Sequence, residues 1–325
     1  MRIDFNTVDI ANHTGYGNAS RLIVESLGRR GVEMHPGSPV MLNFCMPSTY
    51  KYSAYTIGYT PWESTEVPKS WLKGLNDVDD MWTTSTWVAD IFQRYRMERP
   101  FVVPHGIEPC WTRGRHYRED RPFTFVHVGE PAERKGGEIL LDAWYRHFRG
   151  RKDVCLIYKC VGYPMARVKD KSGSILASPG SLDNVIVHGN VYNQAQMWKL
   201  YRDADCMVYP TRGEGFGLIP FEAMATGLPT ILPAMGGTRD FAPLSELTLH
   251  NSMWTQSTSE VIHPGLWLDH DVDELIYLME DAMSRFDYHC DYAFRSAEEI
   301  HARYSWDRVA TIIEDRISDA LIGRR

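Results

Sequence analysis

The stretch from Tyr209 to Thr230 constrains the fold of this chain more than any other part of the sequence. A short apolar run at 206–209 is typical of a buried strand. Glycines then punctuate a loop, and from Leu218 the pattern is helical, with a proline in the first turn where its missing N–H is tolerated. Gly227 ends the helix, and residues 229–232 begin another strand. The stretch therefore predicts a strand, a glycine loop, a helix and a second strand, and we expect an α/β chain.

The glycine loop of this unit predicts an anion site with hydroxyl acceptors on either side. Free N–H groups and the positive end of the helix dipole point into such a loop. Glu214 in the loop and Glu222 on the helix frame the site, with seven residues between them. Ionised carboxylates only accept hydrogen bonds, so they suit hydroxyl groups better than a diphosphate. The predicted ligand has a negative centre and hydroxyl-rich ends, which describes a nucleotide-sugar.

The segment Glu214-Gly-Phe-Gly-Leu-Ile-Pro-Phe-Glu222 resembles the signature of retaining glycosyltransferases of family 4, which have the GT-B fold. The resemblance implies two Rossmann-like, doubly wound α/β domains that face each other across a cleft. It implies that Glu214 contacts the transferred sugar and that Glu222 contacts the ribose. The loop amides would contact the sugar and the diphosphate, at Gly215, Phe216, Gly217 and Leu218. The plain alternative is a glycine-rich turn that carries two surface glutamates.

Two cations after the strand at 123–129 are further candidates for the donor site. Lys135-Gly136 resembles the Lys-Gly pair of the family, whereas Glu130 stands where family members typically have Arg. Arg134 can supply the missing charge, and two cations beside a helix start suit a diphosphate leaving group. A solvated basic pair is the alternative. The resemblance also implies that the nucleotide base lies against the backbone after a later strand, at Asn190, Val191 and Tyr192.

The first half of the chain supplies candidates for the opposite wall of the cleft. Gly15 and Gly17 follow the first predicted strand and open a helix, which is typical of a phosphate or sugar cradle and also of a plain tight turn. Many family members carry His on the acceptor side, at the end of a strand where this chain has Glu63. Glu63 either orients an acceptor hydroxyl or caps the turn.

The pattern of strands and charges divides the chain into four parts. The segment from Thr112 to Arg121 is polar and charged and lies between two strand patterns, so we interpret it as an interdomain linker. With the resemblance, this pattern implies an N-terminal acceptor-side domain at 1–112, the linker at 113–122, a C-terminal nucleotide-sugar-binding domain at 123–304, and a helix at 305–325 that returns to the N-terminal domain, as in GT-B enzymes.

Composition excludes several other classes of protein. The formal net charge is −7, so no global basic field recruits nucleic acid or anionic membrane. Six cysteines without Cys-x-x-Cys pairing indicate reduced thiols, and we expect a cytoplasmic protein. No apolar run approaches the roughly 20 residues that a membrane span needs. The twelve histidines show no ligand spacing, so we predict no metal and no cofactor, with the nucleotide-sugar as co-substrate.

We therefore expect a metal-independent, retaining hexosyltransferase that uses a UDP- or GDP-sugar and an acceptor hydroxyl. A cell-surface glycan is the commonest acceptor in the family, and a small metabolite is a second possibility. A hydroxylated base in nucleic acid is a third, which the arginine cluster would suit and the net charge opposes: Arg113, Arg115, Arg118 and Arg121. From a different class, the chain could be a non-catalytic relative that binds nucleotide-sugars or glycans. The departures at Glu130 and Glu63 keep that alternative open.

Overall fold

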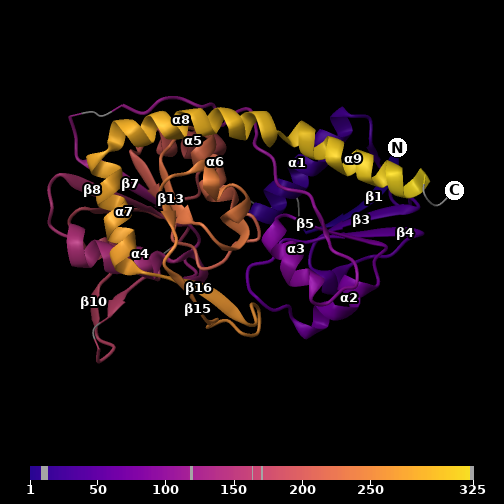
Figure 1. Cartoon of the computed structure of the whole chain (residues 1–325), viewed down its shortest axis with the longest axis horizontal. Helices are drawn as coiled ribbons and strands as arrows, with labels where there is room; N and C mark the ends of the chain where they lie inside the picture. Colours follow the sequence, from indigo (N-terminus) through magenta and orange to yellow (C-terminus); the bar gives the residue numbers. More distant parts are fainter. Residues whose placement is uncertain (9–13, 118–119, 163, 170, 323–325) are drawn as a thin grey trace.

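The computed structural model describes residues 1–8, 14–117, 120–162, 164–169 and 171–322. Within these residues the chain forms two six-stranded sheets, one in each half, in which every pairing is parallel. Figure 1 shows the two halves side by side, each a sheet with its own helices. The predicted α/β fold is confirmed.

The first sheet occupies the N-terminal half. Its strand order is β2-β1-β3-β4-β5-β6, with the bounds β1 Arg2–Thr7, β2 Glu33–Met34, β3 Val40–Phe44, β4 Tyr55–Tyr59, β5 Asp80–Thr83 and β6 Phe101–Val102. Every residue of β3 and β4 is buried, as is usual for parallel strands that are covered on both faces. Its helices are α1 Gly15–Arg29, α2 Leu72–Asn76 and α3 Thr86–Gln93. Figure 1 shows α1 above this sheet and α2 and α3 below it.

The second sheet occupies the C-terminal half. Its order is β11-β8-β7-β12-β13-β14, with the bounds β7 Phe123–Val128, β8 Val154–Lys159, β11 Val185–His188, β12 Cys206–Val208, β13 Thr230–Pro233 and β14 Thr248–Leu249. The helices of this half are α4 Gly137–Ala143, α5 Gln194–Asp203, α6 Leu218–Ala225, α7 Val272–Ser284 and α8 Phe286–Arg303. Asp271 caps the start of α7, because its carboxylate accepts from the amides of Asp273 and Glu274.

Two small antiparallel pairs extend from the second half. The first joins β9 Val168–Lys169 to β10 Ile175–Ala177. The second is a hairpin of β15 Ser252–Gln256 and β16 Leu266–His270. Figure 1 shows this hairpin below the junction of the two halves, reaching toward the first half. The hairpin thereby brings residues of the second half to the edge of the first.

The chain crosses between the halves twice, and the two crossings lie against each other. Ile107 forms an isolated parallel bridge with Ser305, and its amide donates to the Tyr304 carbonyl at 2.5 Å. A Cβ on Gly106 would lie 2.7 Å from the backbone nitrogen of Trp306, so this crossing needs a glycine. Helix α9, Trp306–Ile322, then runs over α1 (Figure 1). The C-terminal helix therefore packs on the N-terminal half.

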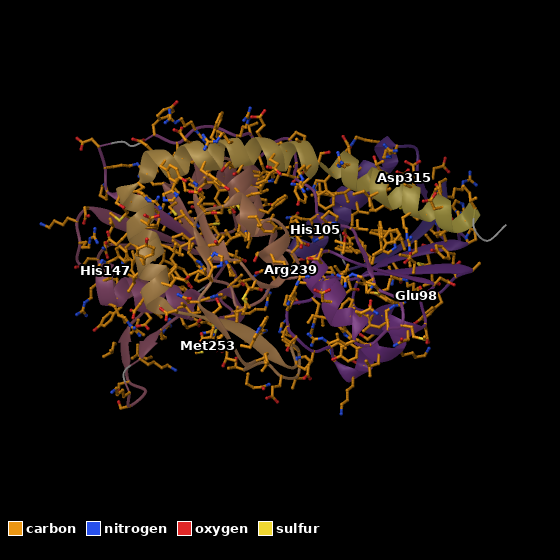
Figure 2. All side chains as sticks on the ribbon, in the orientation of Figure 1. Glu98, His105, His147, Arg239, Met253 and Asp315 are labelled. Atoms are coloured by element: carbon orange, nitrogen blue, oxygen red, sulfur yellow. The ribbon has the colours of Figure 1, made fainter. Side chains whose placement is uncertain are left out.

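His105 lies where the two halves meet (Figure 2). Its ring packs against Phe44 of the first half and Phe216 of the second, at 6.0 and 5.3 Å between ring centroids, and against Trp306 at 5.8 Å. Burial lowers the pKa of His105 to about 3, so the imidazole is neutral at physiological pH. His105 is thus an aromatic packing residue between the sheets.

The charged segment after Thr112 packs on the second half. The amide of Gly114 donates to the Thr226 carbonyl at 3.0 Å, and the described arginines of the segment pair with carboxylates of that half. These ion pairs are Arg113 with Glu298 at 2.9 Å, Arg115 with Asp291 at 2.9 Å and Arg121 with Asp205 at 2.6 Å. Arg118 lies outside the described residues. The positive charge of the segment is therefore largely offset within the chain.

Candidate functional site

The glycine loop has the architecture that its sequence predicts. It connects β12 to the first residue of α6, Leu218, and β13 follows the helix. Gly217 precedes α6 with a φ of +103°, a left-handed conformation that side chains rarely adopt. The side chain of Phe216 is buried against Phe221 and Phe241, so only its backbone can face a ligand. The loop thus presents its backbone at the start of a helix.

Glu214 is the centre of a buried charge cluster. One of its carboxylate oxygens, Oε1, lies 2.6 Å from Lys135 Nζ and accepts from the Tyr209 hydroxyl at 2.7 Å. The hydroxyl of Thr211 donates to the same oxygen at 3.1 Å, and Arg134 Nη1 lies 3.5 Å away. Burial raises the pKa of this carboxyl, but Lys135 and Arg134 outweigh it and hold the pKa below its ordinary value. Glu214 is therefore ionised, and both predicted cations lie beside it.

Arg134 and Lys135 are held in place by the turn in which they lie. The turn Glu133–Lys135 ends at Gly136, which has a φ of +70° and whose added Cβ would lie 1.8 Å from the Pro210 carbonyl oxygen. Because a side chain there would collide with backbone, glycine lets the turn press against the end of β12. The Arg134 guanidinium donates to the Gly213 carbonyl at 2.7 Å. Arg134 Nη2 also lies 3.1 Å from Glu130, the residue that replaces the usual Arg of the family.

Glu63 lies across from this cluster, on the first half. A Cβ on Gly213 would lie 2.0 Å from the Glu63 carbonyl oxygen, so the two backbones are in contact. Close by, the Thr84 hydroxyl donates to the Gly215 carbonyl at 2.7 Å. Burial raises the pKa of the Glu63 carboxyl, but Arg134, His263 and Lys135 together lower it below its ordinary value. The structure therefore brings Glu63 into the same electrostatic cluster as Lys135.

Four residues near the site were not predicted from the sequence. Tyr209 contacts Glu214, and His263 Nε2 lies 3.6 Å from Glu63 Oε2. Tyr16 lies near enough to Glu63 for that carboxylate to raise its pKa, after the larger effect of burial. The fourth is Glu108, described below beside Glu222. Nothing in the spacing of these residues signals their proximity, since His263 follows Glu63 by 200 positions.

The first predicted glycine turn is described from Thr14 onward. The Thr14 hydroxyl caps α1 by accepting from the Gly17 amide at 3.1 Å. A Cβ on Gly15 would meet nothing within 4 Å, whereas Gly17 is buried. Residues 9–13 of this turn lie outside the described residues. Among the described residues the space beside Gly15 is therefore open, and Tyr16 at this end of α1 lies within electrostatic reach of Glu63.

Glu222 lies on α6, beside a second carboxylate, Glu108. Burial raises the pKa of Glu222 to about 8, and the charge of Glu108 adds to the rise. Glu108 itself lies 3.4 Å from Arg21 Nη2 on α1 and accepts from Gln194 on α5 at 2.5 Å. At a pKa of about 8, most Glu222 side chains carry a proton at neutral pH. The contacts of Glu108 with α1 and α5 place the Glu222 region between elements of both halves.

The predicted base-binding residues follow β11. Asn190 and Val191 are exposed, and the Tyr192 hydroxyl lies 2.7 Å from Nδ1 of His188. The ammonium of Lys159 lies 4.8 Å from the centroid of the Tyr192 ring. Since Gln194, only two residues later, contacts Glu108, this segment lies near the Glu222 region. It does not reach the Glu214 cluster in any described contact.

Two hollows of the described residues lie away from the glycine loop. One, of about 400 Å³, lies between the charged segment and α5 and is lined by residues that include Arg115, Arg121 and Arg202. The other lies between α6 and α8, near Tyr292. At the loop itself, Gly215 packs so closely on the first half that an added Cβ would lie 2.5 Å from Pro61 Cβ. The halves are therefore closed on each other at the loop.

No group of three or more His, Cys, Asp or Glu side chains in the described part of the chain has an arrangement that could hold a metal ion. No helix among the described residues is both long enough and apolar enough to span a bilayer.

Comparisons with known proteins agree with this geometry. Residues 122–246 match the family described as "Glycosyl transferases group 1". A D-inositol 3-phosphate glycosyltransferase from Arthrobacter sp. is 31% identical over 103 residues, which are 32% of this chain. The match spans about a quarter of that relative, 24% of its length. Residues 122–246 are therefore similar to group 1 glycosyltransferases, in agreement with the resemblance of the segment from Glu214 to Glu222.

Solved structures match over nearly the whole chain. Sucrose-phosphate synthase from Thermosynechococcus elongatus has a TM-score of 0.73 and 13% identity, over 99% of both chains. Anabaena HepE, solved in complex with UDP-glucose, has a TM-score of 0.68 and 12% identity, over 98% of this chain and 100% of that one. The predicted GT-B fold is confirmed by these neighbours.

Proposed function

We propose that this group 1 glycosyltransferase is a retaining, metal-independent enzyme that moves a hexose from a UDP- or GDP-sugar to an acceptor hydroxyl. The observation that carries the proposal is the buried cluster of Glu214, Lys135 and Arg134 beside a glycine loop. The binding of UDP-glucose by HepE, a protein of the same fold, supports a nucleotide-sugar donor. The activity of the chain and its substrates are part of this proposal.

In the proposed reaction the donor diphosphate lies at the loop amides and at Lys135 and Arg134. The acceptor oxygen attacks the anomeric carbon on the face from which the diphosphate departs, and the departing phosphate oxygen takes the acceptor proton. The bond from the anomeric carbon to the phosphate oxygen breaks as the new glycosidic bond forms. Negative charge grows on the diphosphate, so fixed cations stabilise the transition state more than the ground state.

The two glutamates have separate tasks in this proposal. Glu214 accepts from hydroxyls of the transferred sugar, and its existing bonds to Tyr209 and Thr211 hold the carboxylate in position. Glu222 accepts from the ribose hydroxyls, and the segment 190–192 receives the base. Since the loop is packed against Pro61, the halves must part for the donor to enter and then close around it.

A glycan acceptor is favoured over nucleic acid by the charges of the structure. Arg113, Arg115 and Arg121, the described members of the arginine cluster, pair with carboxylates of the second half, so their charges are largely offset. Duplex and single-stranded nucleic acids are held mainly through phosphate contacts with unpaired cations. The net charge of −7 opposes such contacts as well. We therefore propose a glycan hydroxyl, most simply of a cell-surface glycan.

The test of the proposal is release of free UDP or GDP from a panel of nucleotide-sugars. Purified full-length chain is incubated with each UDP- and GDP-hexose, with and without oligosaccharide acceptors. We expect one donor to release nucleotide slowly by hydrolysis and faster with an acceptor. Binding of a donor without any release would instead identify a non-catalytic nucleotide-sugar-binding protein.

Chelation is expected to leave this activity intact. The described residues offer no group of side chains that could hold a metal ion, and Lys135 and Arg134 can offset the diphosphate charge. Nucleotide release is measured after dialysis against EDTA, with and without added Mn²⁺. Complete loss in EDTA that Mn²⁺ restores would contradict the metal-independent assignment.

Replacing Gly213 by alanine is expected to lower kcat/KM by about tenfold, because a misplacement of 1 Å can cost up to 10²-fold. The new Cβ would lie 2.0 Å from the Glu63 carbonyl oxygen, which belongs to the other half, so the halves cannot close fully. Gly74→Ala is the matched control, because its Cβ would lie 2.0 Å from the Pro47 carbonyl oxygen within the first half, away from the glycine loop. We expect Gly74→Ala to lower the unfolding temperature and Gly213→Ala to leave it nearly unchanged. Full activity in Gly213→Ala would show that closure at this loop is unnecessary.

A further inference from the structure

The β15–β16 hairpin is fixed to the first half directly beside Glu63. The Ser64 hydroxyl donates to the Pro264 carbonyl at 2.7 Å, and the Leu266 amide donates to the Thr65 hydroxyl at 2.7 Å. Gly265 has a φ of +86°, and its added Cβ would lie 2.6 Å from Thr65 Oγ1. The hairpin loop of the second half therefore lies against residues 64–65 of the first in a defined register.

This register brings His263 to the carboxylate of Glu63. The imidazole stacks on Trp62, with 5.4 Å between the ring centroids and 28° between the planes. Trp62 is fixed in turn, since its indole N–H donates to the Glu66 carbonyl at 2.7 Å. His263 Nε2 lies 3.6 Å from Glu63 Oε2. The stacking of His263 on Trp62 therefore orients the Nε2 edge of the imidazole toward the Glu63 carboxylate.

The other edge of the imidazole is buried and unpaired. Nδ1 of His263 has no hydrogen-bond partner among the described residues, and neither has Nε1 of Trp267, whose ring centroid is 5.6 Å from that of His263. Buried polar atoms without partners are rare in native proteins. The contact with Glu63 requires the imidazole proton on Nε2, the edge that faces the carboxylate.

We propose that His263 is a positioning residue that holds the Glu63 carboxylate at the acceptor side of the cleft. This inference rests on the proposed function. In it, Glu63 accepts a hydrogen bond from the incoming hydroxyl, while Lys135 and Arg134 face the departing diphosphate. The acceptor site of the first half is complete only when the hairpin of the second half is docked. The titratable groups that face Glu63 are Arg134, Lys135, His263 and Tyr16.

The first test compares His263→Phe with His263→Gln. Phe keeps the stacking on Trp62 and removes the donor, whereas the Gln amide can still donate to Glu63. The readout is nucleotide release by hydrolysis from the donor identified in the panel, measured as a function of pH. His263 is one of the groups that lower the pKa of Glu63, so its loss shifts the acid limb of the profile to higher pH. We expect the acid limb to move to higher pH in His263→Phe, and to move less in His263→Gln.

Thr65→Val is the control for loosening of the hairpin. It removes the acceptor of the Leu266 amide without touching Glu63 or His263, so the acid limb should stay in place. Affinity for free UDP or GDP should be the same in all three variants, because the base and ribose are proposed to lie at residues 190–192 and Glu222, which no described bond of His263 or Thr65 reaches. An unchanged profile in His263→Phe, or an equal shift in Thr65→Val, would overturn the positioning role.

A second test is independent of catalysis. Urea midpoints are measured for the full chain with Glu63→Gln, His263→Phe and both substitutions together. If the two side chains interact, the double variant loses less stability than the two single variants lose together. Additive losses of stability would overturn the inference. Additive losses would leave the proposed function standing. If the wild-type chain releases no nucleotide from any donor, the proposed function fails and the role of His263 fails with it.

Discussion

Replacing Lys135 by alanine is expected to lower kcat by about 10²–10³, with a smaller change in the KM for the donor. Lys135 is buried beside the glycine loop, where water screens its charge little. The diphosphate gains charge as the glycosidic bond breaks, so the ammonium stabilises the transition state more than the bound donor. Steady-state kinetics with the preferred donor measure both constants. An unchanged kcat with a raised KM would show that Lys135 only docks the donor.

The same substitution also affects stability, so it needs a control. Lys135 Nζ lies 2.6 Å from Glu214, and its removal leaves that buried carboxylate with Arg134 at 3.5 Å as its remaining cation. Removing one partner of a buried pair costs up to about 3–5 kcal/mol, and the presence of Arg134 should reduce this cost. Lys135→Arg keeps the charge, so it should retain stability and more of kcat. Urea unfolding of both variants separates loss of folding from loss of catalysis.

Replacing Glu222 by glutamine is expected to weaken free nucleotide and nucleotide-sugar alike. The loss should match that of a hydrogen bond to a charged group, about 1.5–3 kcal/mol, or roughly ten- to hundredfold. Glu214→Gln should leave free nucleotide binding nearly intact, lower kcat and change the preference among donor sugars. Calorimetry with UDP or GDP alone, beside kinetics with two donors, measures these effects. Equal loss of nucleotide affinity in both variants would show that the roles of the two glutamates are reversed or shared.

The raised pKa of Glu222 adds a pH dependence to this prediction. Ribose hydroxyls donate to the ionised carboxylate, so nucleotide binding favours the ionised form and lowers the pKa in the complex. Affinity should therefore rise as the pH increases toward about 8 and level off above it. Glu222→Gln should lose this rise between pH 7 and 9, a range in which the nucleotide phosphates are already ionised. A rise that persists in Glu222→Gln would assign the titration to another group.

Features set by neighbours in the sequence could be predicted well. The order of strand, glycine loop and helix between Cys206 and Ala225 follows from local patterns, because glycine angles and helix periodicity act over a few residues. The position of Lys135 and Arg134 beside the glycine loop could be predicted for a similar reason, since a family pattern with fixed spacing includes their turn. The structure places both beside Glu214, at 2.6 and 3.5 Å.

Contacts between distant segments could not be predicted in this way. Nothing local relates His263 to Glu63, because docking of the β15–β16 hairpin on the first half brings them together. The ion pairs of Arg113 and Arg115 with α8 likewise depend on where that helix runs. The pKa of Glu222 depends first on burial and then on Glu108, which lies next to the crossing between the halves. Such features depend on tertiary packing, which periodicity does not encode.

The most direct test of the donor site is a crystal structure of the chain with its preferred donor, or with UDP-glucose, bound. We expect diphosphate density at the amides of residues 215–217, within hydrogen-bond distance of Lys135 Nζ, with the ribose hydroxyls at Glu222. The 2.6 Å contact between Lys135 and Glu214 should lengthen, because the Lys135 ammonium then also binds the phosphate. Nucleotide density in the hollow lined by Arg115 and Arg202, with the Lys135–Glu214 pair undisturbed, would contradict the proposed donor site.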